Sequence, residues 1–283
     1  MSFFRNRRGG LPTLRPTGER IDPSYVRSPH EQLLADRHEY MYQVTADQLQ
    51  QRATVLDVGC GEGYGTAILA RSGLAVTGVD VERSVIEAAI RSYAESGAEF
   101  QQMTSEKIPF DAGTFDCVTA FHVIEHVEDP ILFVGELARV LKPEGKAIVT
   151  TPNRELRLAP GERPWNRFHL TEFDATSMQE VMAKGFRHVQ MRGVDVSEPG
   201  RSVELRRVET LRRIARLDPL GLRRFVPQAA VQRVTSALTR SPVQDRPIDV
   251  EFEIVDISHR PIDLLAIGFN TVDADTSWRG RPD

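Results

Sequence analysis

The sequence predicts an α/β fold built on a largely parallel sheet. Short apolar runs rich in β-branched residues alternate with helical patterns from about residue 54 to residue 194. A glycine-rich turn separates the first of these strands from the helix that follows it. Because parallel strands are joined by crossovers that are usually helical, the alternation indicates neighbouring strands with helices on both faces. Ligands of such sheets bind beyond the carboxyl ends of the strands.

The first strand, Thr54 to Val58, leads into the turn Gly59-Cys60-Gly61-Glu62-Gly63, and a helical pattern begins at Tyr64. A glycine backbone can adopt positive φ and lie against a ligand, while the free N–H groups of the helix start point outward. A dinucleotide fingerprint requires Gly-x-Gly-x-x-Gly, and the glycines here follow one another at every second position instead. We therefore expect a ligand-binding turn that is not the usual NAD form.

The strand after the next helix, residues 75–79, ends at Asp80. An acid at this place can accept two hydrogen bonds from a ribose diol, and it can also cap the helix of residues 82–95. Further strands are expected at residues 99–102, 115–121, 147–151, 187–194, 249–257 and 262–269. Further helices are expected at residues 30–50, from after Val127 to Leu141, and at 175–184.

Asp57-x-Gly59-x-Gly61-x-Gly63 resembles the first motif of the class I S-adenosylmethionine-dependent methyltransferases. Later signals of that family follow in order. They are Asp80, the segment of residues 103–110, the Phe115-Asp116 start of a strand, and Leu141-Lys142-Pro143-Glu144-Gly145. The chain is thus similar to methyltransferases of types 11 and 12, and among them to bacterial enzymes that O-methylate sugars and glycans.

The resemblance implies a Rossmann-like seven-stranded sheet with an antiparallel last strand, and S-adenosyl-L-methionine as the cofactor. Thr104 and Ser105 stand where the family often carries an acid that bonds the adenine amino group. His122 stands where the sugar subgroup usually has an acid facing the methionine part of the cofactor. The cofactor-binding residues that the resemblance implies are Asp57, Gly59, Gly61, Gly63, Asp80, Val81, Thr104, Ser105, Phe121 and His122.

The domain organisation that we expect is a core with a helical cap inserted before its final strands. We divide the chain into a flexible arm (1–28), the cofactor-binding core (29–197), the cap (198–247), the final strands (248–270) and a tail (271–283). The cap should contain two amphipathic helices and select the acceptor, and it could also serve a homo-oligomer. Thr17-Gly18-Glu19-Arg20, with His38 and Tyr40 in the next helix, resembles the N-terminal approach of the sugar subgroup; a solvated turn and an amphipathic covering helix are the alternative.

The composition is that of a globular protein and gives no indication of nucleic acid or a membrane as a partner. The 283 residues are 40% hydrophobic and carry a net charge of -4, so nothing pulls the whole chain toward nucleic acid or an anionic membrane. The two cysteines do not suggest a disulfide framework, and the basic N-terminus lacks the apolar core of a secretory signal. We expect a cytoplasmic enzyme that acts on a small molecule or glycan.

Two histidines are the candidates for catalysis. His126 follows the fourth strand and His169 lies in the loop after the fifth, so the expected topology directs both toward one crevice. A sugar hydroxyl is a poor nucleophile while protonated, and a base or a metal helps to remove its proton. We expect His169 to be the base, with His126 and Glu125 shaping the site. The structural alternatives are a packed helix-start histidine at 126 and a backbone-bonded loop histidine at 169.

The sequence alone is also compatible with other functions. The acceptor atom could be a nitrogen, the acceptor could lack a sugar, or the chain could bind the cofactor without catalysis. His122-x-x-Glu125-His126 also matches an inverted zinc-peptidase motif, which requires both histidines on one helical face. A divalent metal could assist methyl transfer, but we assign no metal ligand. The arginines of the cap could hold an acidic acceptor, or they could form a solvated helix face with internal ion pairs.

Overall fold

The computed structural model describes residues 28–104, 107–158, 162, 164, 166, 168–216 and 249–271. The predictions for most of the arm, for Ser105, for the second cap helix and for most of the tail lie outside these residues. Among the helices of the described part, none has the length and apolar character needed to cross a membrane.

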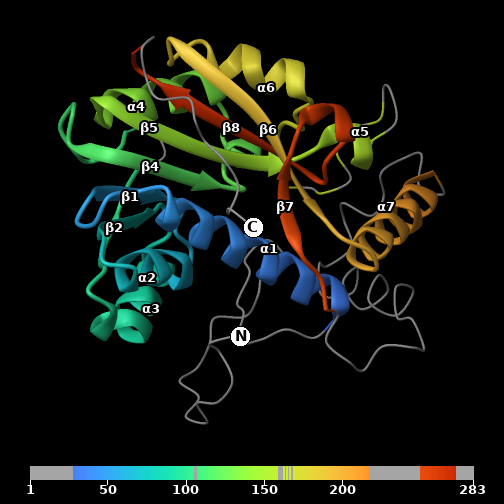
Figure 1. The fold of residues 1–283 in the computed structure, drawn as a ribbon, viewed down its shortest axis with the longest axis horizontal. Helices are drawn as coiled ribbons and strands as arrows, with labels where there is room; N and C mark the ends of the chain where they lie inside the picture. Colours follow the sequence, from blue (N-terminus) through green and yellow to red (C-terminus); the bar gives the residue numbers. More distant parts are fainter. Residues whose placement is uncertain are drawn as a thin grey trace.

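The described chain folds around one eight-stranded sheet of order β3-β2-β1-β4-β5-β8-β6-β7 (Figure 1). Neighbours among the first five strands are parallel, whereas β8 is antiparallel to both β5 and β6. The strands are β1 (Thr54–Val58), β2 (Ala75–Asp80), β3 (Glu99–Gln102), β4 (Phe115–Phe121), β5 (Leu141–Pro152), β6 (His188–Val196), β7 (Phe252–Val255) and β8 (Asp263–Phe269).

The α/β class and the antiparallel last strand are confirmed. The sheet has eight strands, as many as the apolar runs of the sequence predict and one more than the seven that the family resemblance implies. The strand predicted at residues 249–257 is present as β7, which pairs antiparallel with the outer edge of β6. β5 also begins earlier than expected, at Leu141, because the Leu-Lys-Pro-Glu-Gly segment joins the sheet. The register between β4 and β5 shifts between Phe115 and Cys117 to accommodate it.

Helices cover the two faces of the sheet in two groups. In Figure 1, α2 and α3 lie together at the lower left and α1 extends from α2 across the middle of the view, whereas α4 and α6 lie in the upper part. Two of the helices begin with a side-chain cap: Ser28 accepts from the Glu31 N–H, and Asp129 accepts from the N–H groups of Ile131 and Leu132. The helices are α1 (Pro29–Asp47), α2 (Tyr64–Arg71), α3 (Arg83–Tyr93), α4 (Pro130–Val140), α5 (Arg154–Arg157), α6 (Ala175–Met182) and α7 (Gly200–Arg216).

Both faces of the central strands are buried, which explains their continuous apolar runs. In β8, Leu264 and Ala266 pack into the core formed with α4 and α6. Leu265 and Ile267 point the other way, into the core formed with α1 and α2. The strand also begins with a buried charged residue, Asp263, which breaks this apolar pattern at the edge where the strands of the parallel part end.

The carboxyl ends of β1, β2, β4 and β5 meet at one edge of the sheet. Val58 pairs with Val79, and Phe121 pairs with Thr150, so the loops that follow these strands emerge together. The chain leaves β1 toward β2 on one side and returns through β4 on the other, and this reversal opens a crevice above β1 and β4. The candidate site lies at this edge.

Candidate functional site

The glycine turn after β1 is folded as a cradle. Gly59, Gly61 and Gly63 have φ values of +72°, +55° and +85°, a region that other residues rarely adopt. The N–H groups of Gly59 and Cys60 both donate to the Val79 carbonyl, at 2.8 and 3.0 Å, and fix the turn to β2. A methyl group at Gly61 would meet no atom within 4 Å, so this side of the turn is open to a ligand.

Asp57, near the end of β1, links the elements that surround the glycine turn. Its carboxylate is completely buried and accepts hydrogen bonds from the hydroxyls of Thr66 at 2.7 Å, Thr119 at 2.8 Å and Tyr42 at 3.2 Å. These donors come from α2, β4 and α1, so the acid ties three elements to β1. Burial raises the pKa of Asp57 to about 6, although the three hydroxyls oppose that shift. The side chain of Asp57 thus supports the elements around the end of β1, and its contact with the cofactor stays a prediction.

We expect Asp57→Asn to change how stability depends on pH. The folded pKa of about 6 exceeds the ordinary 3.8, so between these values the folded protein binds the proton more tightly than the unfolded chain. Wild-type stability should therefore fall as the pH rises through this window, by up to about 3 kcal/mol from this group. The asparagine variant should lack that slope. Urea unfolding at several pH values measures the difference, with the exposed Asp111→Asn as control; parallel curves for wild type and Asp57→Asn would contradict it.

Asp80 lies beside the open side of the turn. One carboxylate oxygen accepts the Gly61 N–H at 3.1 Å, and the other accepts the Glu82 N–H at 2.9 Å. The residue that caps α3 is Glu82, without a side-chain hydrogen bond, so Asp80 does not have the capping role considered from the sequence. The apolar side chain of the next residue, Val81, is 49% exposed at this edge.

A second hollow follows β3 and adjoins the same edge. It is lined by Gln102, Met103, Thr104, Lys107 and Pro109. The Thr104 hydroxyl is turned toward its own loop, where it accepts the Lys107 N–H at 3.3 Å. The described residue at the position expected to approach adenine therefore lines a concave surface together with the apolar Met103.

The two residues expected at the end of β4 have different surroundings. Phe121 is buried, and its ring packs edge-on against Tyr42 at 4.8 Å, so its side chain supports the core. His122 has a φ of +55° and its ring lies in the cavity. The ring contacts Asp263 at 2.8 Å through Nε2 and lies 4.6 Å from the ring of His38.

A polar cavity opens next to His122, between the ends of β4 and β5 and the helices α1 and α7. Among its lining residues are three cations and three anions: Arg37, Arg157, Arg207, Glu125, Glu204 and Asp263. Five of the chain's histidines also line it: His30, His38, His122, His126 and His169. The structure thus brings together Glu125, His126 and His169, the three residues expected to be catalytic.

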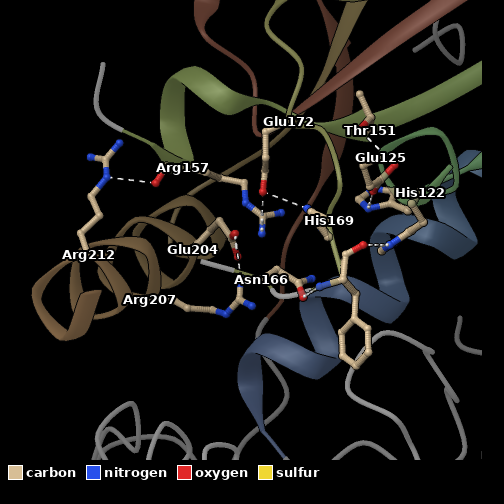
Figure 2. Close-up of polar contacts among 12 residues, drawn as sticks. His122, Glu125, Thr151, Arg157, Asn166, His169, Glu172, Glu204, Arg207 and Arg212 are labelled. Atoms are coloured by element: carbon tan, nitrogen blue, oxygen red, sulfur yellow. Dashed lines mark hydrogen bonds and ion pairs between the residues drawn. The ribbon is translucent and has the colours of Figure 1, made fainter. Parts of the chain in front are cut away.

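His169 is held by a buried acid that the sequence did not single out. Its Nδ1 lies 2.8 Å from Glu172, and Glu172 also contacts Arg157 at 3.6 Å (Figure 2). Burial lowers the pKa of His169, and the positive charge of Arg157 adds to this effect, although Glu172 opposes it. Burial would raise the pKa of Glu172, but the hydrogen bond to His169 and the charge of Arg157 outweigh it and lower that pKa. The imidazole is therefore neutral near pH 7.

Glu125 and His126 lie opposite His169. The ring of His126 is perpendicular to that of His169, with 4.8 Å between the centroids. Glu125 is 1% exposed, and one of its oxygens accepts the Thr151 hydroxyl at 3.1 Å (Figure 2). Its backbone carbonyl accepts the N–H groups of Leu170 and Thr171 and so fixes the His169 loop to the end of β4.

The inverted zinc-peptidase interpretation is not supported by the local backbone. That motif requires two histidines on one face of an α-helix. Here His122 has a left-handed backbone and residues Ile124–His126 form a 3-10 turn. The nearest partner of His122 is Asp263, whereas His126 lies beside His169.

Helix α7 contributes a partly buried ion pair to the cavity wall. Glu204 and Arg207 of α7 contact each other at 3.4 Å, and Glu204 also contacts His30 of α1 at 3.1 Å. Burial and the charge of Arg207 lower the pKa of His30 to about 4, so this imidazole is neutral. On the outer side of α7, Arg213 pairs with Glu209, as the solvated-face interpretation of the cap arginines expects. α7 therefore has one face in the cavity and another with internal ion pairs.

Comparisons with known proteins agree with this geometry. A family model described as a methyltransferase domain matches residues 56–149. A probable S-adenosylmethionine-dependent methyltransferase of Mycolicibacterium smegmatis is 31% identical over 263 residues, which are 89% of this chain and 97% of that protein. A ubiquinone biosynthesis O-methyltransferase of Caulobacter vibrioides is 36% identical over 133 residues, 41% of this chain and 53% of that protein.

The fold agrees with a solved structure as well. The YcgJ protein of Bacillus subtilis superposes with a TM-score of 0.51 at 19% identity, covering 82% of this chain and 97% of that one. The glycine turn, the acid at the end of β2 and the relative that matches over 89% of this chain lead to the same conclusion. The chain belongs to the class I S-adenosylmethionine-dependent methyltransferases, and S-adenosylmethionine is its cofactor.

Proposed function

We propose that this methyltransferase transfers the methyl group of S-adenosylmethionine to a hydroxyl of a saccharide, a glycolipid or a glycosylated small molecule. The observation that supports the proposal most strongly is the equal number of positive and negative side chains in the polar cavity. This cavity lies at the edge of the sheet where the carboxyl ends of the parallel strands meet. Three arginines face three carboxylates on its described wall. Burial lowers the pKa of His30, His38 and His169, so these imidazoles add hydrogen-bonding groups without adding charge.

A charge-balanced wall rich in donors and acceptors suits a neutral acceptor with many hydroxyls. An acidic acceptor would find each cation of the wall opposed by an anion, and an apolar acceptor would leave the buried charges without hydrogen-bonding partners. Each sugar hydroxyl can both donate and accept, so it can bond to either kind of group. The partial similarity to an O-methyltransferase of ubiquinone biosynthesis supports oxygen as the acceptor atom.

The catalytic residues that we propose are His169, His126 and Glu125. The methyl group of a sulfonium is already reactive, so the protein mainly has to hold the acceptor oxygen in line and promote the loss of its proton. The three residues lie together in the cavity and can promote that loss through His169 as a base or through a bound cation. The cap, of which α7 supplies Glu204 and Arg207 to the wall, would set the choice of acceptor.

Labelling identifies the acceptor. The protein is incubated with a cell extract and S-adenosylmethionine that carries an isotopically labelled methyl group, and the labelled products are separated and sequenced by mass spectrometry. We expect a methyl ether on a saccharide-containing product. A label on nitrogen or on a product without sugar would contradict the proposed acceptor, and donor binding without any labelled product would indicate a non-catalytic module.

The donor site can be tested without knowing the acceptor. We expect Asp80→Ala to weaken S-adenosylhomocysteine binding by about 2–4 kcal/mol, roughly 30- to 1,000-fold, because it removes a charged acceptor of two ribose hydrogen bonds and the anchor of the Gly61 N–H. Calorimetry measures the affinity, with the exposed Asp111→Ala as the matched control. Equal affinities for Asp80→Ala and the control would contradict the assignment of Asp80.

A further inference from the structure

Three side chains in the cavity hold possible metal-ligand atoms near one another. Glu125, His126 and His169 each offer one ligand atom, and these three atoms lie within 4.8 Å of one another. Metal–ligand bonds of about 2.0–2.2 Å place neighbouring ligand atoms of one ion about 3–4 Å apart. Small rotations of these side chains would therefore close the three atoms onto a single cation.

Both imidazoles are oriented as metal ligands usually are. The Nδ1 of His169 lies 2.8 Å from a Glu172 oxygen, and the Nδ1 of His126 lies 3.1 Å from the Phe168 carbonyl oxygen. A carboxylate and a carbonyl can only accept, so each Nδ1 donates to its partner and a metal would be bound through Nε2. Histidines that bind metals through one nitrogen generally donate the other N–H to such a group.

The carboxylate of Glu125 is buried, and only one of its two oxygens accepts a hydrogen bond from the described residues. The side chain is 1% exposed, and its Oε2 accepts the Thr151 hydroxyl. Within the described part of the chain its Oε1 accepts no hydrogen bond, and Nδ1 of His122 lies 3.6 Å from it. An anionic oxygen in this position is costly to bury, and a cation next to it would offset the cost.

We propose that Glu125, His126 and His169 bind one divalent transition-metal ion of the manganese, cobalt and zinc class. Two imidazoles and one carboxylate suit these ions, whereas Mg²⁺ and Ca²⁺ prefer oxygen ligands. Three protein ligands leave at least one coordination position open toward the cavity. Glu172, the Phe168 carbonyl and Thr151 hold the three ligands in place.

This inference rests on the proposed transfer to a hydroxyl and deepens it. A cation beside the acceptor oxygen lowers the pKa of its hydroxyl, so the O–H bond breaks and the proton passes to solvent water. The oxygen's electron pair then forms the bond to the donor methyl carbon. The carbon–sulfur bond breaks, and its pair stays on sulfur and neutralises the sulfonium. His169 is a ligand in this scheme and replaces the base expected from the sequence.

Cobalt titration tests the site directly. The full chain is stripped with a chelator and titrated with Co²⁺, whose visible absorption reports coordination, and the bound metal is counted by mass spectrometry. We expect one ion per chain and an affinity at least about 100-fold lower in His126→Ala, His169→Ala and Glu125→Gln. Glu172→Gln, which removes only the support of His169, should cost about 10- to 100-fold. The exposed His259→Ala is the control for adventitious binding and should match wild type.

Binding of S-adenosylhomocysteine shows whether each variant is folded, because the donor site is separate from the three ligands. Unchanged Co²⁺ affinity in folded Glu172→Gln and Glu125→Gln would overturn the metal site, as would labelled product formed at the same rate after complete metal removal. Either result leaves the proposed methyl transfer in place. One tightly bound ion in a protein that labels no hydroxyl would support the site and count against the proposed acceptor chemistry instead.

Discussion

Replacing Asp263 by alanine is expected to lower the free energy of unfolding by about 3–5 kcal/mol, because it leaves a buried cation without its partner. Asp263 contacts Arg37 at 2.9 Å and His122 at 2.8 Å, and the side chains of Asp263 and Arg37 are only 3% and 5% exposed. The three residues come from β8, α1 and the end of β4, so the loss would also loosen the cavity wall.

Urea unfolding followed by circular dichroism measures this effect. The matched control is Glu87→Ala, which breaks an exposed ion pair with Arg83 and should cost less than about 1 kcal/mol. The double variant Arg37→Met/Asp263→Leu should recover most of the loss, since it removes both charges and restores apolar packing. A cost for Asp263→Ala no larger than that for Glu87→Ala would show that the buried pair does not hold the helix to the sheet.

The sequence predicted the parts of the site that local pattern determines. The glycine turn and Asp80 stand within a continuous strand-turn-helix-strand segment, and the steric need for glycine is visible in the residues themselves. The alternation of apolar runs predicted the ends of the strands to within about three residues, except for the start of β5, which lies at Leu141. The strand at residues 249–257 was also predicted, but not its place at the edge of the sheet, because its pairing with β6 joins residues that are distant in the chain.

The acceptor side was much less predictable, because its contacts join residues far apart in the chain. An acid at the head of the apolar run 262–269 was a visible signal at Asp263, but its partner His122 lies 141 residues away. Glu172 was part of the loop noted for His169, and only the fold shows that it turns back onto that ring. The match of residues 122–126 to the zinc-peptidase motif was misleading. The motif consists of three residue types at fixed spacing, and these do not reveal that the backbone at His122 is left-handed and not helical.

Removing the His169 imidazole is expected to reduce the rate of methyl transfer to the identified acceptor by about 10²–10⁴-fold. The reason holds whether the ring accepts the hydroxyl proton or binds the cation that acidifies it: in both cases, the ring acts on the acceptor and does not hold the donor. His169→Asn should therefore lower kcat while the affinity for S-adenosylhomocysteine stays unchanged. Asparagine can still donate to Glu172, which preserves the loop.

Single-turnover rates with saturating labelled donor separate this effect from binding. The exposed His259→Ala should retain the wild-type rate, so a loss specific to position 169 would link the buried His169–Glu172 pair to the chemical step. If His169→Asn kept the wild-type rate, the ring would serve only to pack the loop against β4. The acceptor proton would then have to leave through another group on the cavity wall, and His122, already next to the cofactor edge, would be the residue to change next.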